Sequence, residues 1–159
     1  MFTLTEEAAP ETAIELTAGQ FDVAKFNAVL TLTSPTTGEH RTFRVRTVSG
    51  GPLEGQRLIE LLIGSDNEND YKAFATVGNE LTRWCPEGEI RCWKRFKGAS
   101  EPSEYERFCD LLARPAYWSG RGVRYQISAN CRRCNRALTH PESLDHGYGP
   151  VCWDKVNGG

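Results

Sequence analysis

The sequence predicts a small α+β fold, in which a β-rich body with one or two helices precedes a small C-terminal finger domain. Runs of β-branched and aromatic residues alternate with turn signals over the first two thirds of the chain. A single stretch, SEYERFCDLLARP, has the periodicity and capping residues of a helix. Cysteines and histidines then gather in CRRCNRALTHPESLDHGYGPVC. These three observations define the body, its helix and the finger.

The charge of the chain is distributed unevenly along its 159 residues. The net charge of −2 combines −5 over residues 1–40, −4 over residues 66–90 and +7 over residues 91–136. A local excess of one sign indicates the kind of partner more than the kind of fold. No run reaches the roughly 18 apolar residues of a membrane span, and the acidic N-terminus lacks the layout of a signal peptide. We therefore expect a cytoplasmic protein without a membrane partner.

The first strands are predicted from a hairpin pattern. FNAVLTLT (26–33) and HRTFRVRTV (40–48) are strand-like, and SPTTGE between them is a turn. Arg44 and Arg46 fall on one face of the second strand, because side chains alternate along a strand. This face is expected either to be solvated or to meet an anionic ligand.

The middle of the chain is predicted to continue the sheet. Residues 53–64 fit a two-turn helix or a strand, and the acidic residues 65–71 fit a solvated turn better than a calcium loop. KAFATV, NELTRWC and IRCWKRF read as strands, and VRYQIS as a later short one. Residues 103–115 are predicted to be helical, with Ser103 and Glu106 as a capping box. Three cysteines are expected to be buried without a chemical role: Cys85, Cys92 and Cys109.

The Cys/His segment has the spacing of a zinc site. Zinc prefers four tetrahedral ligands, and two cysteines separated by two residues occupy one edge of the tetrahedron. Cys131 and Cys134 supply that edge, and Cys152 supplies a third thiolate. The fourth ligand is His140 or His146. Since the protein then fills all four positions, the predicted Zn²⁺ is structural, and the fold class is α+β with a C-terminal zinc finger.

The finger segment also resembles an uncharacterised small zinc-finger domain common in actinobacterial phage and prophage proteins. The shared pattern is C-x2-C-x-R-x-L-T-x-P-x-S-x3-G-x-G-P-x-C, and HRTFRVRT, LIGSDNENDY and WKRFKG extend the similarity more weakly upstream. This chain has Asn135 where the family usually has glycine, and His146 where it usually has a basic residue. The position of His140 more often carries a possible ligand in that family, which favours His140. The resemblance implies a phage protein in the host cytoplasm, with zinc and without an established activity.

The predicted organisation is a flexible N-terminal arm (1–20), a β-rich α+β domain (21–125) and a zinc finger (126–159).

Two groups of cations lie in the basic stretch, residues 91–136. Aromatic rings can stack on unpaired bases, while lysine and arginine neutralise phosphates. These groups, with Trp93 and Phe96 beside them, therefore predict a nucleic-acid-binding module. In the alternative interpretation, Trp93 and Phe96 belong to the core and the cations form a solvated face. The candidate residues are Lys94, Arg95 and Lys97 beside the two rings, and Arg121, Arg124, Arg132, Arg133 and Arg136 around the finger.

The alternative function is a protein-interaction module that binds and inhibits a host enzyme or defence factor. Its contacts would come from the acidic run SDNEND and the acidic N-terminal arm. Catalysis is not expected, because the chain has no G-x-S-x-G, P-loop, H-E-x-x-H or zinc-deaminase signature. A small-molecule substrate is not expected either.

Overall fold

An antiparallel sheet forms the body of the protein. The computed structural model describes residues 14–15, 27–82, 84–127, 133 and 136–157. Within these ranges seven strands pair in the order β1-β7-β2-β3-β4-β5-β6. Strands β2 to β6 follow one another as hairpins, whereas β7 returns to pair with β2. The strands are β1 (Ile14–Glu15), β2 (Ala28–Thr33), β3 (His40–Thr47), β4 (Arg57–Leu62), β5 (Tyr71–Val77), β6 (Ile90–Cys92) and β7 (Arg124–Ile127).

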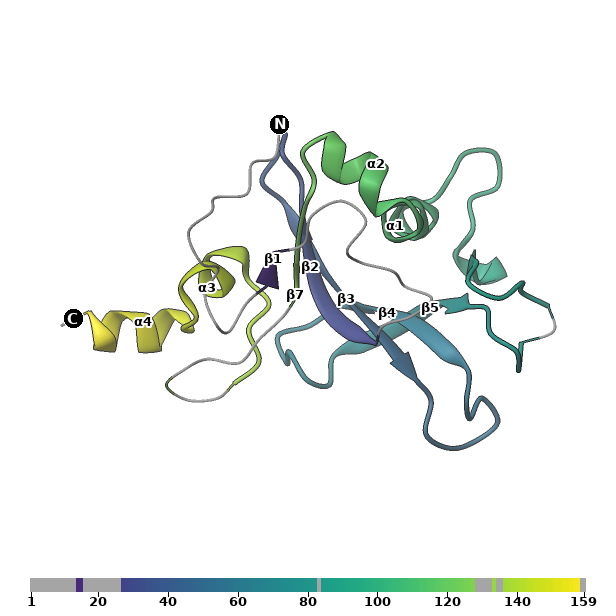
Figure 1. The fold of residues 1–159 in the computed structure, drawn as a ribbon, viewed down its shortest axis with the longest axis horizontal. Helices are drawn as coiled ribbons and strands as arrows, with labels where there is room; N and C mark the ends of the chain where they lie inside the picture. The colour runs from purple at the N-terminus through teal and green to yellow at the C-terminus, as the bar shows by residue number, and fades with distance from the viewer. Residues whose placement is uncertain (1–13, 16–26, 83, 128–132, 134–135, 158–159) are drawn as a thin grey trace.

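Short helices lie on one face of the sheet and past its β7 side. Helix α1 lies across one face, while α3 and α4 lie beyond the β7 side, with α4 pointing away from the body (Figure 1). The helical elements of the described chain are η1 (Lys94–Phe96), α1 (Glu104–Ala113), α2 (Pro115–Gly120), α3 (Pro141–His146) and α4 (Pro150–Val156). This arrangement confirms the predicted α+β class. None of the helices in the described ranges is long and apolar enough to cross a membrane.

Apolar side chains fill the face of the sheet that α1 covers. The register pairs Leu30 with Phe43, and alternation then places every second residue of β2 to β4 on the same face. A register shift between β4 and β5 brings the consecutive residues Phe74 and Ala75 into the core together. Leu30, Phe43 and Ile59 are completely buried. Phe108 and Leu112 of α1 pack against them in one cluster. The main core therefore lies between the sheet and α1.

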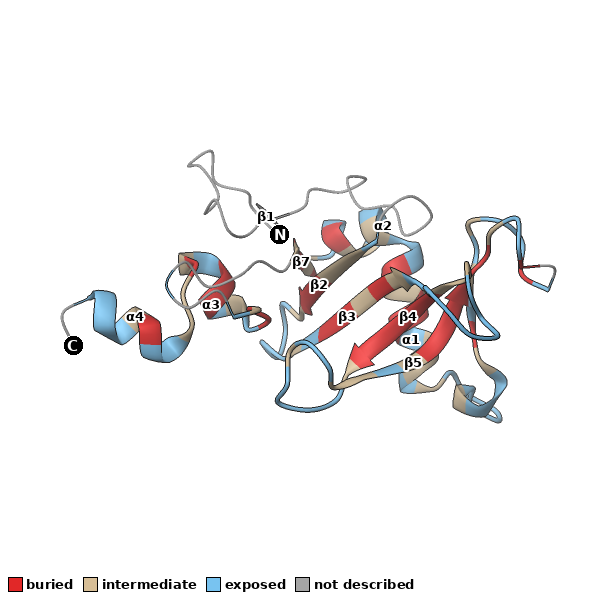
Figure 2. Ribbon diagram, turned by 90° about the horizontal axis from the view of Figure 1, so that it is seen from below, coloured by how far each residue is buried: buried red, intermediate tan, exposed pale blue. Residues whose placement is uncertain are grey.

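The opposite face of the sheet, called the polar face below, carries hydrogen-bonding and charged side chains. Thr31, Thr42 and Glu60 are buried there, and Arg44 and Arg46 lie beside them. No described helix lies over the β3–β5 part of this face (Figure 2). The sheet thus has one apolar face, which forms the core, and one face that is available for polar contacts.

The C-terminal segment packs on the polar face through hydrogen bonds. The Thr31 hydroxyl donates to the Thr139 carbonyl oxygen at 2.7 Å. The Asn67 side-chain amide donates to the Ala137 carbonyl oxygen at 2.9 Å. This segment has a small core of its own, in which Leu138, Leu144 and Cys152 are buried together. It is therefore a separately packed unit attached to the sheet by polar contacts.

The predicted hairpin is confirmed, and the ambiguous residues 53–64 contain a strand, β4. The predicted strand at residues 79–85 is wrong, because the Asn79 side chain organises a turn by accepting from the Leu81 amide at 2.9 Å. Gly78 permits this fold-back, since a Cβ there would lie 1.9 Å from the Pro86 carbonyl oxygen. The return strand therefore ends at Cys92, and it pairs with β5.

The helix predicted at residues 103–115 is confirmed as α1 with its capping box. The Glu106 amide donates to the Ser103 hydroxyl, and the Glu106 carboxylate accepts from the Ser103 amide at 3.1 Å. The Glu106 carboxylate also accepts from the Gly98 amide at 2.7 Å, and the hydrogen bonds from the Gly98 and Ser103 amides hold the pKa of Glu106 below its usual value. Helix α2, which follows at once, was not predicted; Pro115 occupies its first turn, where the missing amide is not needed.

Candidate functional site

The predicted metal ligands divide between described and undescribed parts of the chain. Cys131 and Cys134 lie outside the described residues. Among the described residues, no three or more His, Cys, Asp or Glu side chains form a group that could hold a metal ion. The fit of the predicted zinc site can be tested on its other three candidate ligands, which are His140, His146 and Cys152.

His146 has the surroundings of a metal ligand. It is the last residue of α3, and its ring stacks on Trp153 of α4 with a centroid distance of 3.9 Å and an interplanar angle of 8°. The stacked ring is thereby fixed in orientation. Its Nδ1 atom is buried and has no hydrogen-bond partner among the described residues. Because nearly all buried polar atoms have a partner, an orphaned imidazole nitrogen is the atom a metal would satisfy.

Cys152 lies close to the chain segment that contains the paired cysteines. Its side chain is buried in the first turn of α4. The Arg133 guanidinium lies 3.6 Å from the Cys152 sulfur, and Arg133 stands between Cys131 and Cys134 in the sequence. Cys152 and His146 therefore fit the predicted donor set.

His140 has different surroundings. It is exposed and precedes α3 at the helix N-cap position. Its ring packs edge-on against His40 of β3, with a centroid distance of 4.6 Å. Burial and the nearby His140 lower the pKa of His40. The surroundings of His140 thus belong to the contact with the sheet, and they favour His146 as the fourth ligand.

The three cysteines outside the finger are buried, as expected. Cys92 and Cys109 belong to the main core, and Cys85 is a buried residue of the loop between β5 and β6. Burial is the main cause that raises the pKa of all three thiols. Raised thiol pKa values and burial are typical of unreactive structural cysteines.

The predicted nucleic-acid-binding residues do not form one surface. Lys94, Arg95 and Lys97, called the β6 cations, lie in and beside η1, which follows the edge strand β6. The second group, called the finger arginines, consists of Arg121, Arg124, Arg132, Arg133 and Arg136, of which Arg132 lies outside the described residues. Arg121 follows α2, Arg124 lies on β7, and Arg133 and Arg136 belong to the C-terminal segment, so these residues lie toward the β7 side of the sheet and not at β6 (Figure 1). The two groups are therefore separate candidates.

The β6 cations are exposed next to aromatic rings. Arg95 lies over the Phe96 ring at 4.9 Å and near the Trp93 ring at 5.6 Å from the centroid. The Trp93 indole donates to the Thr76 hydroxyl at 2.9 Å, which holds the ring at the polar face. Within the described chain, none of the β6 cations has an ion-pair partner within 4.0 Å. Their charge is thus available to an external anion.

Several finger arginines are already engaged inside the protein. Arg124 forms an ion pair with Asp145 of α3, which ties β7 to the C-terminal segment. Arg121 lies over the Tyr117 ring at 4.7 Å, and Arg133 lies against the Cys152 sulfur. These contacts reduce the part of each guanidinium that a phosphate can reach.

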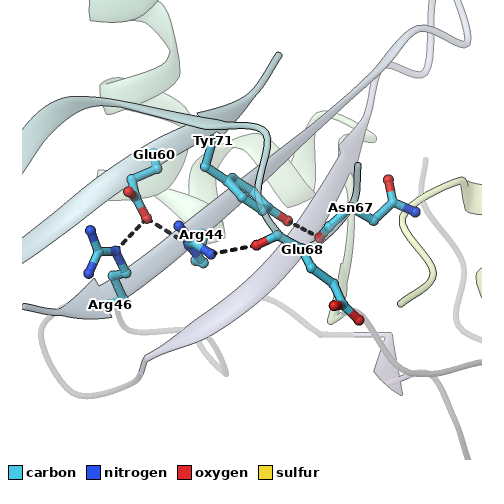
Figure 3. Close-up of polar contacts among 6 residues, drawn as sticks. All are labelled: Arg44, Arg46, Glu60, Asn67, Glu68 and Tyr71. Atoms are coloured by element: carbon cyan, nitrogen blue, oxygen red, sulfur yellow. Dashed lines mark hydrogen bonds and ion pairs between the residues drawn. The ribbon is translucent and has the colours of Figure 1, made fainter. Parts of the chain in front are cut away.

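A third group of charges lies on the polar face, and only its two arginines were singled out from the sequence. Arg44 and Arg46 of β3 both converge on Glu60 of β4 (Figure 3). Tyr71 of β5 lies under the Arg44 guanidinium, 4.1 Å from it, and burial raises the pKa of this phenol. The sequence signal for Glu60 was its place as a lone acid within the apolar run RLIELLI.

The comparisons with known proteins identify one part of the chain. Residues 128–157 match a family of unknown function (DUF6011). The match begins directly after β7 and covers α3 and α4, so a small C-terminal domain of uncharacterised function follows the sheet. Neither the search of curated proteins nor that of solved structures found a match.

Proposed function

We propose that this protein is a non-catalytic, nucleic-acid-associated binding module that contacts single-stranded nucleic acid through the β6 edge of its sheet. The observation that carries the proposal is the group of three exposed β6 cations beside Trp93 and Phe96, none of which has an ion-pair partner within 4.0 Å in the described chain. Phosphate contacts supply affinity and bases supply flat rings for stacking. A cationic edge beside a fixed indole offers both.

A single strand suits this surface better than a duplex. Sequence reading in a duplex requires a helix or ribbon that enters the major groove with polar side chains. The β6 edge instead carries a partly exposed indole that is held in place by Thr76. A fixed aromatic ring can stack on an unpaired base of any sequence. We therefore expect preference for single-stranded over duplex nucleic acid and weak sequence preference.

The proposed role of zinc is to fold the C-terminal domain. We assign Cys131, Cys134, His146 and Cys152 as its ligands, with the orphaned Nδ1 of His146 as the supporting observation. A zinc ion with four protein ligands stabilises a small domain and leaves no open position for substrate. The resemblance of this domain to phage zinc fingers supports a protein that acts in the cytoplasm of a host cell.

A host protein partner is the second candidate. Leu81 and Trp84, in the loop before β6, expose 60% and 51% of their surface. Exposed tryptophan is enriched among the residues that dominate protein interfaces. On this reading the acidic turn at residues 65–70 and this loop would bind a host enzyme or defence factor.

The experiment is a salt titration of binding to labelled single-stranded DNA, duplex DNA and RNA. The variant Lys94→Gln/Arg95→Gln/Lys97→Gln is compared with Arg132→Gln/Arg133→Gln/Arg136→Gln, which removes the same charge at the finger. We expect the first variant to lower affinity and to reduce the salt dependence by about 2 to 3 units of slope. Equal losses in both variants would contradict the assignment to the β6 edge. Absence of binding at low salt would contradict nucleic-acid binding and favour the protein partner.

A further inference from the structure

A buried carboxylate holds two arginines in place on the polar face. The side chain of Glu60 is only 5% exposed, and its Oε1 atom accepts from Arg44 Nε at 2.7 Å and from Arg46 Nε at 2.9 Å (Figure 3). Two guanidiniums and one carboxylate leave a net charge of +1. Charge-assisted hydrogen bonds of this length are strong and directional. Glu60 thus fixes the orientation of both arginine side chains.

Both arginines use Nε for this contact, which leaves terminal nitrogens for other partners. The Arg44 Nη1 atom donates to the Glu68 carbonyl oxygen at 3.1 Å, and its guanidinium lies over Tyr71. The side chain of Arg46 is 40% exposed. Within the described residues, neither terminal nitrogen of Arg46 has a hydrogen-bond partner. Arg46 therefore presents a fixed pair of donors with the spacing that a phosphate or carboxylate accepts.

The strand register connects this pair with the β6 edge. Arg46 pairs with Leu58, Leu58 with Thr76, and Thr76 with Arg91, so these side chains form one row across the polar face. Three strand spacings separate the two ends of the row, which is about 14 Å. The Trp93 indole lies along this row, bonded to Thr76. Arg46 and Trp93 therefore lie on the same face of the sheet, with the buried Leu58 and Thr76 in the row between Arg46 and Arg91.

We propose that the polar face between β3 and β6 is a phosphodiester-binding site for single-stranded nucleic acid, in which Arg46 is the bidentate phosphate ligand. This proposal rests on the proposed function and specifies the path of the bound strand. Glu60 is a positioning residue, because it touches the arginines and not the phosphate. An extended strand would cross from the β6 cations over Trp93 to Arg46. The positive charge and the Trp93 ring both complement a single strand.

The effect of Glu60→Gln on binding distinguishes a positioned arginine pair from attraction by net charge alone. Glu60→Gln raises the net charge by one, so attraction of a polyanion by charge alone predicts tighter binding. Loss of the ionic contact frees the two guanidiniums, and binding by a positioned fork then weakens. Arg46→Lys keeps the charge and removes the fork. The control Arg41→Lys makes the same change on the α1-covered face, where Arg41 lies 3.8 Å from Glu104.

The experiment measures Kd for a labelled single-stranded oligonucleotide at fixed salt, with thermal unfolding of each variant as a check on folding. We expect Arg46→Lys to weaken binding roughly tenfold, which corresponds to one lost charge-assisted hydrogen bond. Glu60→Gln is expected to weaken binding severalfold, and Arg41→Lys to leave it unchanged. If Glu60→Gln does not fold, the comparison of Arg46→Lys with Arg41→Lys decides.

Three outcomes separate this proposal from the proposed function. Unchanged binding by Arg46→Lys, or tighter binding by a folded Glu60→Gln, overturns the polar-face site. If the β6-cation variant still loses affinity in that case, the proposed function stands without this site. Absence of binding by the wild-type protein overturns both.

Discussion

Replacing Thr31 by valine tests how the C-terminal domain is attached to the sheet. Thr31 is completely buried on the polar face. Its hydroxyl donates to the Thr139 carbonyl oxygen at 2.7 Å and lies 2.8 Å from the Thr42 hydroxyl. Since the Thr31 proton goes to the carbonyl, the Thr42 hydroxyl is the donor in the second bond. Valine has nearly the same shape, so Thr31→Val removes both hydrogen bonds and leaves the packing intact.

The expected loss of stability in Thr31→Val follows from the two polar groups that lose their hydrogen-bond partner. The Thr139 carbonyl oxygen and the Thr42 hydroxyl are both left buried and unpaired, and each such group costs about 1–3 kcal/mol. Partial relaxation of the Thr42 side chain lowers the total, so we expect Thr31→Val to reduce the free energy of unfolding by about 2–4 kcal/mol.

Thr33 provides a matched control on the same strand and the same face. Its hydroxyl oxygen is buried and has no hydrogen-bond partner among the described residues. Thr33→Val therefore removes an unsatisfied polar atom, and we expect it to leave stability unchanged or to raise it by about 1 kcal/mol. The same chemical change is thus expected to destabilise the protein at Thr31 and not at Thr33.

The free energy of unfolding of both variants is measured by guanidinium denaturation followed by circular dichroism. An unchanged m-value serves as the check on two-state unfolding. Hydrogen exchange at the Leu144 amide, which donates to the His140 carbonyl oxygen at 2.9 Å, reports on the C-terminal domain. Faster exchange there in Thr31→Val, but not in Thr33→Val, places the loss at the attachment. An equal cost for the two variants, or a cost of Thr31→Val below about 0.5 kcal/mol, would refute the reasoning.

Three further predictions concern the metal, acid stability and the thiols. His146→Ala is expected to release zinc and to abolish the thiolate-to-cobalt absorption of the cobalt-loaded protein, whereas His140→Ala retains both; the opposite result would assign His140 as the ligand. Since the pKa of Glu106 is lowered on folding, its contribution to stability is present above the unfolded pKa of about 4.5 and is lost as pH falls through the lower folded value. Melting temperature should therefore fall less steeply below pH 4.5 in Glu106→Gln, and identical curves would contradict this. Cys92 and Cys109 should resist alkylation at pH 8 until the protein unfolds, because both are buried and burial raises their pKa; rapid labelling of either, read by peptide mass, would contradict their core assignment.

Local signals in the sequence predicted local structure well. The hairpin of β2 and β3 depends on a turn between two alternating strands, and the capping box at Ser103 and Glu106 involves residues three apart. The predicted strand at residues 79–85 is wrong for a local reason as well. Asn79 can bond to the backbone two residues on, and this side-chain contact competes with strand pairing.

The grouping of charges could not be predicted, because it depends on the order of strands in the sheet. The β6 cations and Arg124 lie in one basic stretch of the sequence, yet β6 is one edge strand and β7 pairs with β2 near the other. Conversely, Arg46 and Arg91 are 45 positions apart in the sequence and stand in one cross-strand row. Only the register of the intervening strands relates them.

The turn between β4 and β5 joins the arginine pair to the C-terminal domain. The Asn67 side chain donates to the Ala137 carbonyl oxygen and accepts from the Thr139 hydroxyl. One residue on, the Glu68 carbonyl oxygen accepts from Arg44, so a single turn bonds to both. Zinc that folds the C-terminal domain would stabilise this turn and, through it, the orientation of Arg44. On the proposed reading, a structural metal at one side of the sheet thus acts on the phosphate site by fixing the turn that borders it.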